Sequence, residues 1–145
     1  MPSPSSPRAL RVERTALGRF TAVNERGGRI PFATGTDDRD EFTPIELLLA
    51  AIAGCTALDV DALTSRRAEP DSFVVDIRAD KIRDEHGNRL TDIEVTFHVA
   101  FPDGPDGDRA REALPGAVKV SHDRLCTVSR TVEVGTPLVS VVAGA

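Results

Sequence analysis

The sequence of 145 residues contains no tryptophan and no tyrosine, and six phenylalanines supply its large aromatic side chains. Aliphatic side chains therefore have to fill most of the core. Proteins that bind single-stranded nucleic acid usually stack bases on aromatic rings, and phosphate binding needs clustered positive charge. This chain has 18 Lys and Arg residues against 23 Asp and Glu residues, a net charge of −5. The composition argues against nucleic acid as a partner.

Long hydrophobic runs are also missing. The most apolar segment, residues 45–58, is interrupted by Glu46 and is shorter than the roughly 20 residues that a membrane-spanning helix needs. Residues 1–8 have Pro or Ser at most positions and no apolar stretch of the kind found in a signal peptide. We therefore predict a cytoplasmic protein without a membrane partner, in which residues 1–8 form a flexible tail and residues 9–145 form a single domain.

Cysteine is scarce, with only Cys55 and Cys126. In the cytosol a disulfide persists only when it is transient and catalytic, so these cysteines are either inert core residues or a redox pair. Their separation of 71 residues excludes a CxxC motif and a zinc knuckle. Even with His122, a zinc site would lack one ligand, so we expect no bound metal and no cofactor. Taken alone, Cys55 would more often be a small buried hydrophobe.

Hydrophobic periodicity predicts an α+β fold. Alternating apolar and polar residues are typical of strands, and segments rich in Gly and polar residues between them indicate turns. The predicted elements, apart from the long helix described next, are a strand pair in 9–24 that turns near Gly18, a short strand at 29–33, an antiparallel hairpin with strands near 73–79 and 93–99, a helix at 108–125 that kinks or splits at Pro115-Gly116, and a final strand at 132–142.

The clearest local signal is the start of a long helix at Thr43-Pro44-Ile45-Glu46. Thr43 and Glu46 have the spacing of a capping box, in which each side chain bonds the backbone N–H of the other residue, and proline is favoured at the first helical position. The helix should continue to about Arg66 or Arg67. From 47 to 58 it is apolar nearly all round, so we expect it to be enclosed on every side, by a sheet on one face and a second subunit on the other.

Two segments of this sequence resemble signatures of one protein family. The run from Pro44 to Thr56, PIELLLAAIAGCT, resembles the P-x-E-L-L-L-A-A-x-x-G-C segment of the OsmC/Ohr superfamily, and LCTVSR at 125–130 resembles its second signature, a cysteine followed by x-V-S. The predicted plan fits from about residue 10 to residue 142. The resemblance implies antiparallel sheets wrapped around a long central helix in an intertwined homodimer, with active sites at the subunit interface.

The same resemblance implies reduction of organic hydroperoxides. Cys55 would be the peroxidatic residue and Cys126 the resolving one, through a transient intramolecular disulfide that an external dithiol reduces. A thiol in an apolar helix needs a nearby positive charge to ionise, and Arg19 matches the arginine that supplies it in the Ohr branch. A solvated strand arginine is the alternative for Arg19.

One position departs from the family pattern. The residue after the proline is normally a carboxylate that pairs with the arginine, and here it is Ile45. Glu46, one place later, matches a common second acidic position, although capping already accounts for it. His122 precedes Cys126 by four residues and could share a helix face with it. A solvated histidine that complements a helix C-terminus is the simpler interpretation.

Two other functions compete with the peroxidase. The first is a non-catalytic, stress-associated or hydrophobic-ligand-binding dimer in which Cys55 and Cys126 are buried relics, and Ile45 favours it. The second is a general thiol–disulfide oxidoreductase, which the missing CxxC motif disfavours. The retention of both cysteines within their motifs favours the peroxidase.

Overall fold

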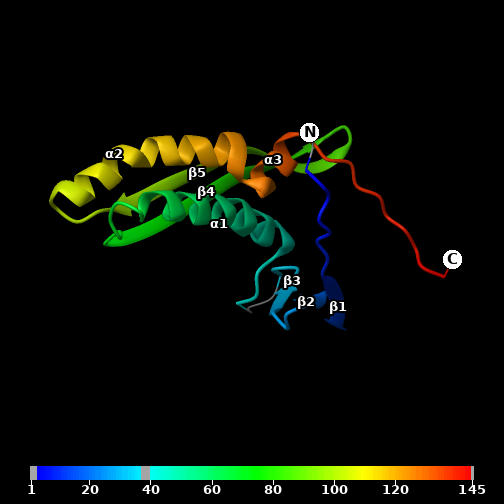
Figure 1. Cartoon of the computed structure of the whole chain (residues 1–145). Coiled ribbons are helices and arrows are strands. Elements are labelled where there is room, and N and C mark those ends of the chain that lie inside the picture. Colours follow the sequence, from blue (N-terminus) through cyan, green and yellow to red (C-terminus); the bar gives the residue numbers. More distant parts are fainter. Residues whose placement is uncertain (1–2, 37–39, 145) are drawn as a thin grey trace. The chain divides into compact units, whose positions relative to one another are not determined.

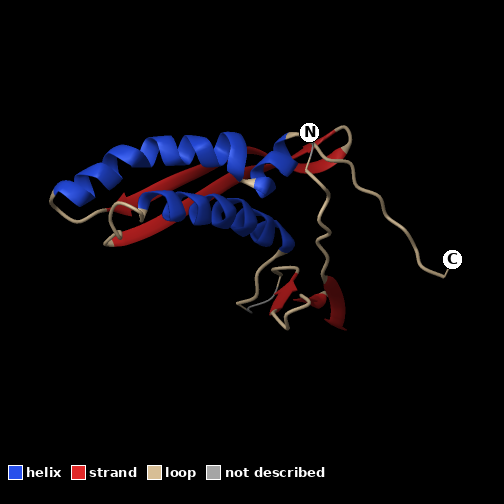
Figure 2. Cartoon of the chain, viewed as in Figure 1, coloured by secondary structure: helices blue, strands red, loops and turns tan. Residues whose placement is uncertain are grey.

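The computed structural model describes residues 3–36 and 40–144, and it has the predicted α+β fold (Figure 2). The chain divides into two compact units, residues 1–48 and residues 49–145. The elements, labelled in Figure 1, follow in the order β1 (Arg11–Ala16), β2 (Arg19–Val23), β3 (Arg29–Ala33), α1 (Pro44–Thr64), β4 (Ser72–Asp84), β5 (Gly87–Ala100), α2 (Pro105–Val120), the π-helical turn η1 (Ser121–Leu125) and α3 (Thr127–Glu133).

The first unit contains a three-stranded antiparallel sheet in the order β1-β2-β3. The predicted strand pair with its turn at Gly18 and the short strand at 29–33 are both confirmed. Gly18 has a φ of 70°, a conformation that side chains with a Cβ rarely adopt, so the turn depends on glycine. Phe20 lies opposite Phe32 in the register, and their rings stack with centroids 6.0 Å apart.

The capping box at the start of α1 forms as predicted. The backbone N–H of Thr43 donates to Glu46 Oε1 at 2.9 Å, and the N–H of Glu46 donates to Thr43 Oγ1 at 3.2 Å. The helix ends at Thr64, slightly earlier than expected, where the N–H of Arg67 bonds the Thr64 carbonyl in a tighter turn.

The predicted cover of α1 by a second subunit stays a prediction, and within the single chain one face of this helix is buried. Its buried residues lie on one face: Ile52, Ala53, Thr56, Val60 and Thr64. Apolar residues on the remaining surface are exposed, including Leu48 at 41% and Leu58 at 74%. By length and composition alone, α1 could also cross a membrane, so the sequence argument that the apolar segment is too short fails. Core helices of soluble proteins share that property.

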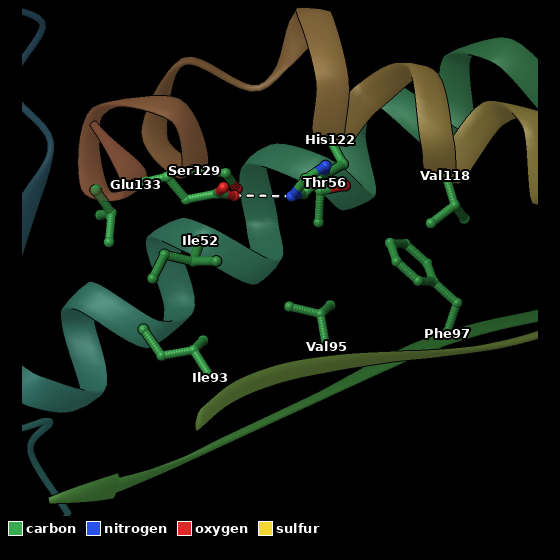
Figure 3. A pocket seen from close by; sticks show the side chains of 10 residues that line it. Ile52, Thr56, Ile93, Val95, Phe97, Val118, His122, Ser129 and Glu133 are labelled. Carbon is green, nitrogen blue, oxygen red and sulfur yellow. Dashed lines mark ion pairs between the residues drawn. The ribbon is translucent and has the colours of Figure 1, made fainter. Parts of the chain in front are cut away.

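The second unit is built on the predicted hairpin, β4 and β5, which is confirmed with longer strands. Phe73 lies opposite Val99, and Ile77 lies opposite Val95. Residues on this face of the strands are half-buried, whereas the alternate residues are exposed. Figure 3 shows Ile93, Val95 and Phe97 of this face pointing from β5 toward the helices of the unit.

The helix after the hairpin does not split at Pro115, which was one of two predicted outcomes, and the other, a kink, stays a prediction. α2 continues through Pro115, because Ala110 and Ala117 are buried on either side of the proline and keep both halves of the helix in place. A proline inside a helix costs about 3 kcal/mol, which this packing offsets. The regular α-helical pattern is interrupted later, in η1.

The predicted final strand at 132–142 is wrong. Val132 belongs to α3, and the described residues from 136 onward form no strand. Leu138 and Val139 are 86% and 83% exposed. A valine-rich segment becomes a strand only when a neighbouring strand supplies hydrogen bonds, and this segment is paired with none of the described strands.

Candidate functional site

The structure brings Cys55 and Cys126 together. Their two Sγ atoms and a carboxylate oxygen of Asp59 all lie within 4.8 Å of one another. Cys55 and Asp59 are four residues apart on α1 and so share one face of the helix, while Cys126 comes from the junction of η1 and α3. Both cysteines are free thiols.

The π-helical turn η1 positions Cys126. The backbone N–H of Cys126 donates to the Ser121 carbonyl at 2.8 Å, which closes the wide turn. The backbone of Cys126 is extended, with φ −76° and ψ 100°. This change of direction makes Cys126 the N-terminal cap of α3, where its Sγ accepts from the N–H of Ser129 at 3.4 Å and lies 3.1 Å from Ser129 Oγ. The side chain is only 2% exposed.

The surroundings treat the two thiols differently. Burial is the main cause that raises the pKa of Cys55; a hydrogen bond from the backbone N–H of Val128 opposes it, and Cys126 and Asp59 add smaller contributions that raise the pKa. Burial also opposes ionisation of Cys126, but the hydrogen bonds from the side chain and backbone of Ser129 outweigh it and lower the pKa of Cys126. Within the unit of residues 49–145, the thiolate is therefore favoured on Cys126.

A buried polar network reaches the cysteine pair through Asp59. Ser121 Oγ donates to Asp59 Oδ2 at 2.9 Å, and Thr56 Oγ1 lies 2.7 Å from Ser121 Oγ. Because a hydroxyl has one proton to donate and that of Ser121 goes to Asp59, Thr56 donates to Ser121. Sequence reasoning missed Asp59 and Ser121. The i, i+4 spacing of Asp59 from Cys55 was the one signal that could have indicated Asp59.

An apolar cavity of about 370 Å³ adjoins this network (Figure 3). Its wall includes Thr56 of the network and Ser129, the hydrogen-bond partner of Cys126. The other lining residues come from α1, β5, α2, η1 and α3: Ile52, Ile93, Val95, Phe97, Val118, His122, Val132 and Glu133. Neither cysteine is among the lining residues, so the cavity can hold an apolar group next to Thr56 and Ser129, which connect it to the thiol pair.

His122 interacts with carboxylates, as expected of a solvated histidine. Its Nδ1 lies 3.0 Å from Asp123 Oδ1, its Nε2 lies 2.7 Å from Glu133 Oε1, and its side chain is 59% exposed. The hydrogen bond with Asp123 and the negative charge of Glu133 raise the pKa of His122. The ion pair with Glu133, dashed in Figure 3, ties η1 to α3 at the wall of the cavity.

The other two predicted site residues, Arg19 and Glu46, lie in the unit of residues 1–48. The Arg19 guanidinium forms an ion pair with Glu41, and both side chains are mostly buried, at 19% and 17% exposed. Glu46 is engaged in the capping box. Ile45, which follows the proline, is 39% exposed. Glu41 is thus the carboxylate partner of Arg19, and the sequence pattern gave no reason to choose it over the other acidic residues of its loop.

A family model described as OsmC-like protein matches residues 35–140, a span that includes both cysteines and the whole of α1. The chain belongs to the OsmC-like family. The two segments that resemble the family, Pro44–Thr56 and Leu125–Arg130, both lie within the matched span.

Individual relatives agree with the OsmC-like assignment. An uncharacterized protein of Mycobacterium tuberculosis is 30% identical over 128 residues, which cover 88% of this chain and 90% of the relative. A solved OsmC-like protein of unknown function from Vibrio cholerae is 15% identical with a TM-score of 0.72, covering 89% of this chain and 95% of that one. An organic hydroperoxide resistance protein from Bacillus subtilis is 18% identical with a TM-score of 0.55, covering 86% and 90% of the two chains. At these identities the solved structures show a shared fold.

Proposed function

We propose that this OsmC-like protein is a thiol peroxidase that reduces organic hydroperoxides, with Cys55 as the peroxidatic residue and Cys126 as the resolving residue. The observation that carries the proposal is the approach of the two sulfurs to within 4.8 Å. Cysteines 71 residues apart in the sequence are placed where a modest side-chain movement allows a disulfide, whose S–S bond is about 2.05 Å long.

The chemistry needs two thiols and one peroxide. The Cys55 thiolate attacks the hydroperoxide, the O–O bond breaks, and the alkoxide leaves as the alcohol after taking a proton, which converts Cys55 to a sulfenic acid. The Cys126 thiolate then attacks the Cys55 sulfur, the S–S bond forms, and hydroxide leaves as water with a second proton. An external dithiol reduces the disulfide by thiol–disulfide exchange.

Ionisation of Cys55 is the demanding part of this proposal. Burial and the neighbouring Asp59 raise the pKa of Cys55, so the residue needs a cation to attack as a thiolate. We assign that role to Arg19. The family normally has a carboxylate at the position of Ile45 that pairs with this arginine, and here Glu41 pairs with it instead. Glu46 contributes by fixing the start of α1, the helix that carries Cys55.

The cavity supports an organic substrate. Its lining is largely aliphatic and aromatic, with Thr56, Ser129 and His122 among the few polar groups. An alkyl or acyl chain would be desolvated there while its hydroperoxide group meets the thiols, whereas hydrogen peroxide would gain nothing from the apolar wall. The Bacillus subtilis neighbour is named for organic hydroperoxide resistance.

We further propose that the protein acts as a homodimer in the cytoplasm. α1 leaves apolar residues such as Leu48 and Leu58 exposed in the single chain, and a second subunit would remove them from water. No membrane and no nucleic acid take part in this proposal. A cytoplasmic location also keeps the two thiols reduced between turnovers.

The test is a thiol titration of reduced, metal-free protein with cumene hydroperoxide. Two thiols per chain should disappear per equivalent of peroxide, and mass spectrometry should find a Cys55–Cys126 disulfide. Cys55→Ser should abolish peroxide consumption, whereas Cys126→Ser should leave a sulfenic acid at Cys55 that dimedone traps. Sulfenic acid trapped at Cys126 in the Cys55→Ser variant would reverse the two roles, and unchanged thiols in excess peroxide would eliminate the peroxidase.

The cavity also favours a second candidate, a non-catalytic dimer that binds a hydrophobic ligand. In that case a fluorescent fatty-acid probe would bind equally well to the native protein and to the Cys55→Ser/Cys126→Ser variant, and the thiols would survive peroxide treatment. Loss of both thiols per equivalent of peroxide would favour the peroxidase over this alternative.

A further inference from the structure

Cys55, Asp59 and Cys126 form a three-ligand cluster that the peroxidase proposal does not fully use. A thiol peroxidase needs the two sulfurs, yet a carboxylate oxygen of Asp59 lies within 4.8 Å of both. None of the three side chains is fully exposed, and Cys126 is buried. Asp59 therefore places a third group able to ligate a metal beside two sulfurs that can do the same.

The ligand types are those that zinc prefers. Zinc is bound by thiolate sulfur at about 2.3 Å and by carboxylate oxygen at about 2.0–2.2 Å, so ligand atoms around a tetrahedral ion lie about 3.5–3.8 Å apart. The cluster, with all its atoms within 4.8 Å of one another, needs only small side-chain rotations to reach this geometry. Three protein ligands also leave a fourth position for water, as in catalytic rather than structural zinc sites.

The scaffold around the cluster already holds each ligand. Cys55 and Asp59 are one turn apart on α1, a spacing at which two side chains of a helix chelate one ion. Asp59 Oδ2 accepts the 2.9 Å hydrogen bond from Ser121, which fixes the carboxylate while lone pairs remain for a metal, and the backbone N–H of Ser129 donates to the sulfur of Cys126. Such outer hydrogen bonds orient metal ligands and are part of a functional site.

We propose that the reduced protein binds one Zn²⁺ per chain through Cys55 Sγ, Cys126 Sγ and an Asp59 carboxylate oxygen. The two thiols lose their protons on binding, and the divalent ion offsets the repulsion among the three negative ligands. The sequence offers His122 as a possible zinc ligand beside the two cysteines. In the structure His122 instead pairs with Asp123 and Glu133. Asp59 takes the place of His122 as the third protein ligand, and water occupies the fourth position.

This site does not depend on peroxidase activity, because it requires only two reduced thiols and a carboxylate. Where both properties are present they compete: bound zinc holds the sulfurs as thiolates, and formation of the disulfide removes two of the three ligands and releases the ion. Zinc binding is therefore measured on reduced protein without peroxide, and peroxide reduction on protein without zinc.

The test titrates reduced, metal-free protein with Co²⁺, and then with Zn²⁺ against a chromogenic chelator, under anaerobic conditions. Binding of one Co²⁺ per chain should produce thiolate-to-cobalt charge-transfer bands and the visible bands of tetrahedral cobalt, and Zn²⁺ should displace it. About two protons should be released per Zn²⁺ near neutral pH. The absence of the charge-transfer bands would overturn the proposal.

Variants assign the ligands. Cys55→Ser, Cys126→Ser and Asp59→Asn should each weaken Zn²⁺ binding by more than the 10–100-fold that loss of an outer hydrogen bond causes. Asp61→Asn is the matched control, because Asp61 is exposed on the same helix and accepts a hydrogen bond from Ser65. Its affinity should equal that of the native protein. An unchanged affinity in Asp59→Asn would remove Asp59 from the site and contradict the proposal.

X-ray absorption of the native zinc complex keeps the test independent of whether the variants fold. The expected shell contains two sulfurs at about 2.3 Å and two lighter atoms at about 2.0–2.2 Å. A shell of four sulfurs would mean that two chains share one ion, and would contradict the site described above. Zinc binding without peroxide-dependent thiol loss would support the metal site and eliminate the peroxidase. Peroxide-dependent thiol loss without zinc binding would support the peroxidase and eliminate the metal site.

Discussion

The hydroxyl group of Ser121, on η1, donates a hydrogen bond of 2.9 Å to Asp59 Oδ2, on α1, beside the two cysteine sulfurs. Ser121 is completely buried and also accepts from Thr56. This one hydroxyl joins α1 to the turn that positions Cys126, so it couples the stability of the second unit to the geometry of the thiol pair.

Ser121→Ala should destabilise the fold by about 1–3 kcal/mol, because it leaves the buried hydroxyl of Thr56 and an oxygen of Asp59 without a partner. Urea unfolding at neutral pH measures the change. Ser65→Ala is the matched control, since Ser65 Oγ donates to Asp61 Oδ1 at the same 2.9 Å but is exposed. Its effect should stay within about 0.5 kcal/mol. Equal effects of the two substitutions would show that the buried network is not important for stability.

Asp59→Asn should make both thiols more acidic in the metal-free protein. The negative charge of Asp59 raises the pKa of Cys55 and opposes ionisation of Cys126, so its removal favours both thiolates. The pH dependence of iodoacetamide alkylation, followed by mass spectrometry, should move to lower pH for each cysteine. Asp61→Asn should leave both profiles in place. A shift to higher pH in Asp59→Asn would contradict the electrostatic assignment.

Ser129→Ala should make Cys126 less acidic. Three hydrogen bonds lower the pKa of Cys126, and the largest of these contributions comes from the Ser129 side chain, while the backbone N–H of Ser129 remains in the variant. In a Cys55→Ser background, alkylation of Cys126 at neutral pH should therefore slow down, and the profile should move to higher pH. Thr131→Val, which alters an exposed hydroxyl on the same helix bonded to the Thr127 carbonyl, serves as the control and should have no effect.

The His122–Glu133 ion pair should give a small pH-dependent contribution to stability. The pKa of His122 is raised in the folded protein. The contribution is therefore complete below about pH 6.5, the ordinary pKa of histidine, and is lost as the pH rises through the folded-state value. Because the pair is largely exposed, it should amount to no more than about 1 kcal/mol.

Urea midpoints of the native protein and of His122→Gln, measured across this pH range, test that prediction. The difference between the two midpoints should shrink as the pH rises. When Glu133→Gln is present in both proteins, the difference at low pH should be smaller than it is with Glu133 in place. A difference that stays constant with pH would mean that His122 contributes through packing rather than charge.

Sequence reasoning succeeded where one short segment contains all the interacting groups. The capping box between Thr43 and Glu46, the turn at Gly18 and the β4–β5 hairpin depend on neighbours within a few residues or on a simple alternation of side chains. The helix carrying Cys55 and the OsmC-like family were also determined by the sequence, because a motif needs no tertiary information to be recognised.

Predictions that required knowledge of distant contacts failed or could not be made. Pro115 lies within a continuous helix because packing on both sides of it outweighs a local penalty. The valine-rich tail meets no strand that could pair with it in the described part of the chain. Glu41 pairs with Arg19 from 22 residues away, in a loop with other acidic residues.

Most of the secondary structure up to residue 120, the family and the two cysteines can be read from the sequence. Folding is needed to bring Asp59 and Ser121, 62 residues apart, together beside the cysteines, and to place Ser129 where it favours ionisation of Cys126 over Cys55. The physical reason is range. Helix caps and turns are set by hydrogen bonds within a few residues, whereas the pKa of a thiol depends on every dipole and charge that folding brings within a few ångströms.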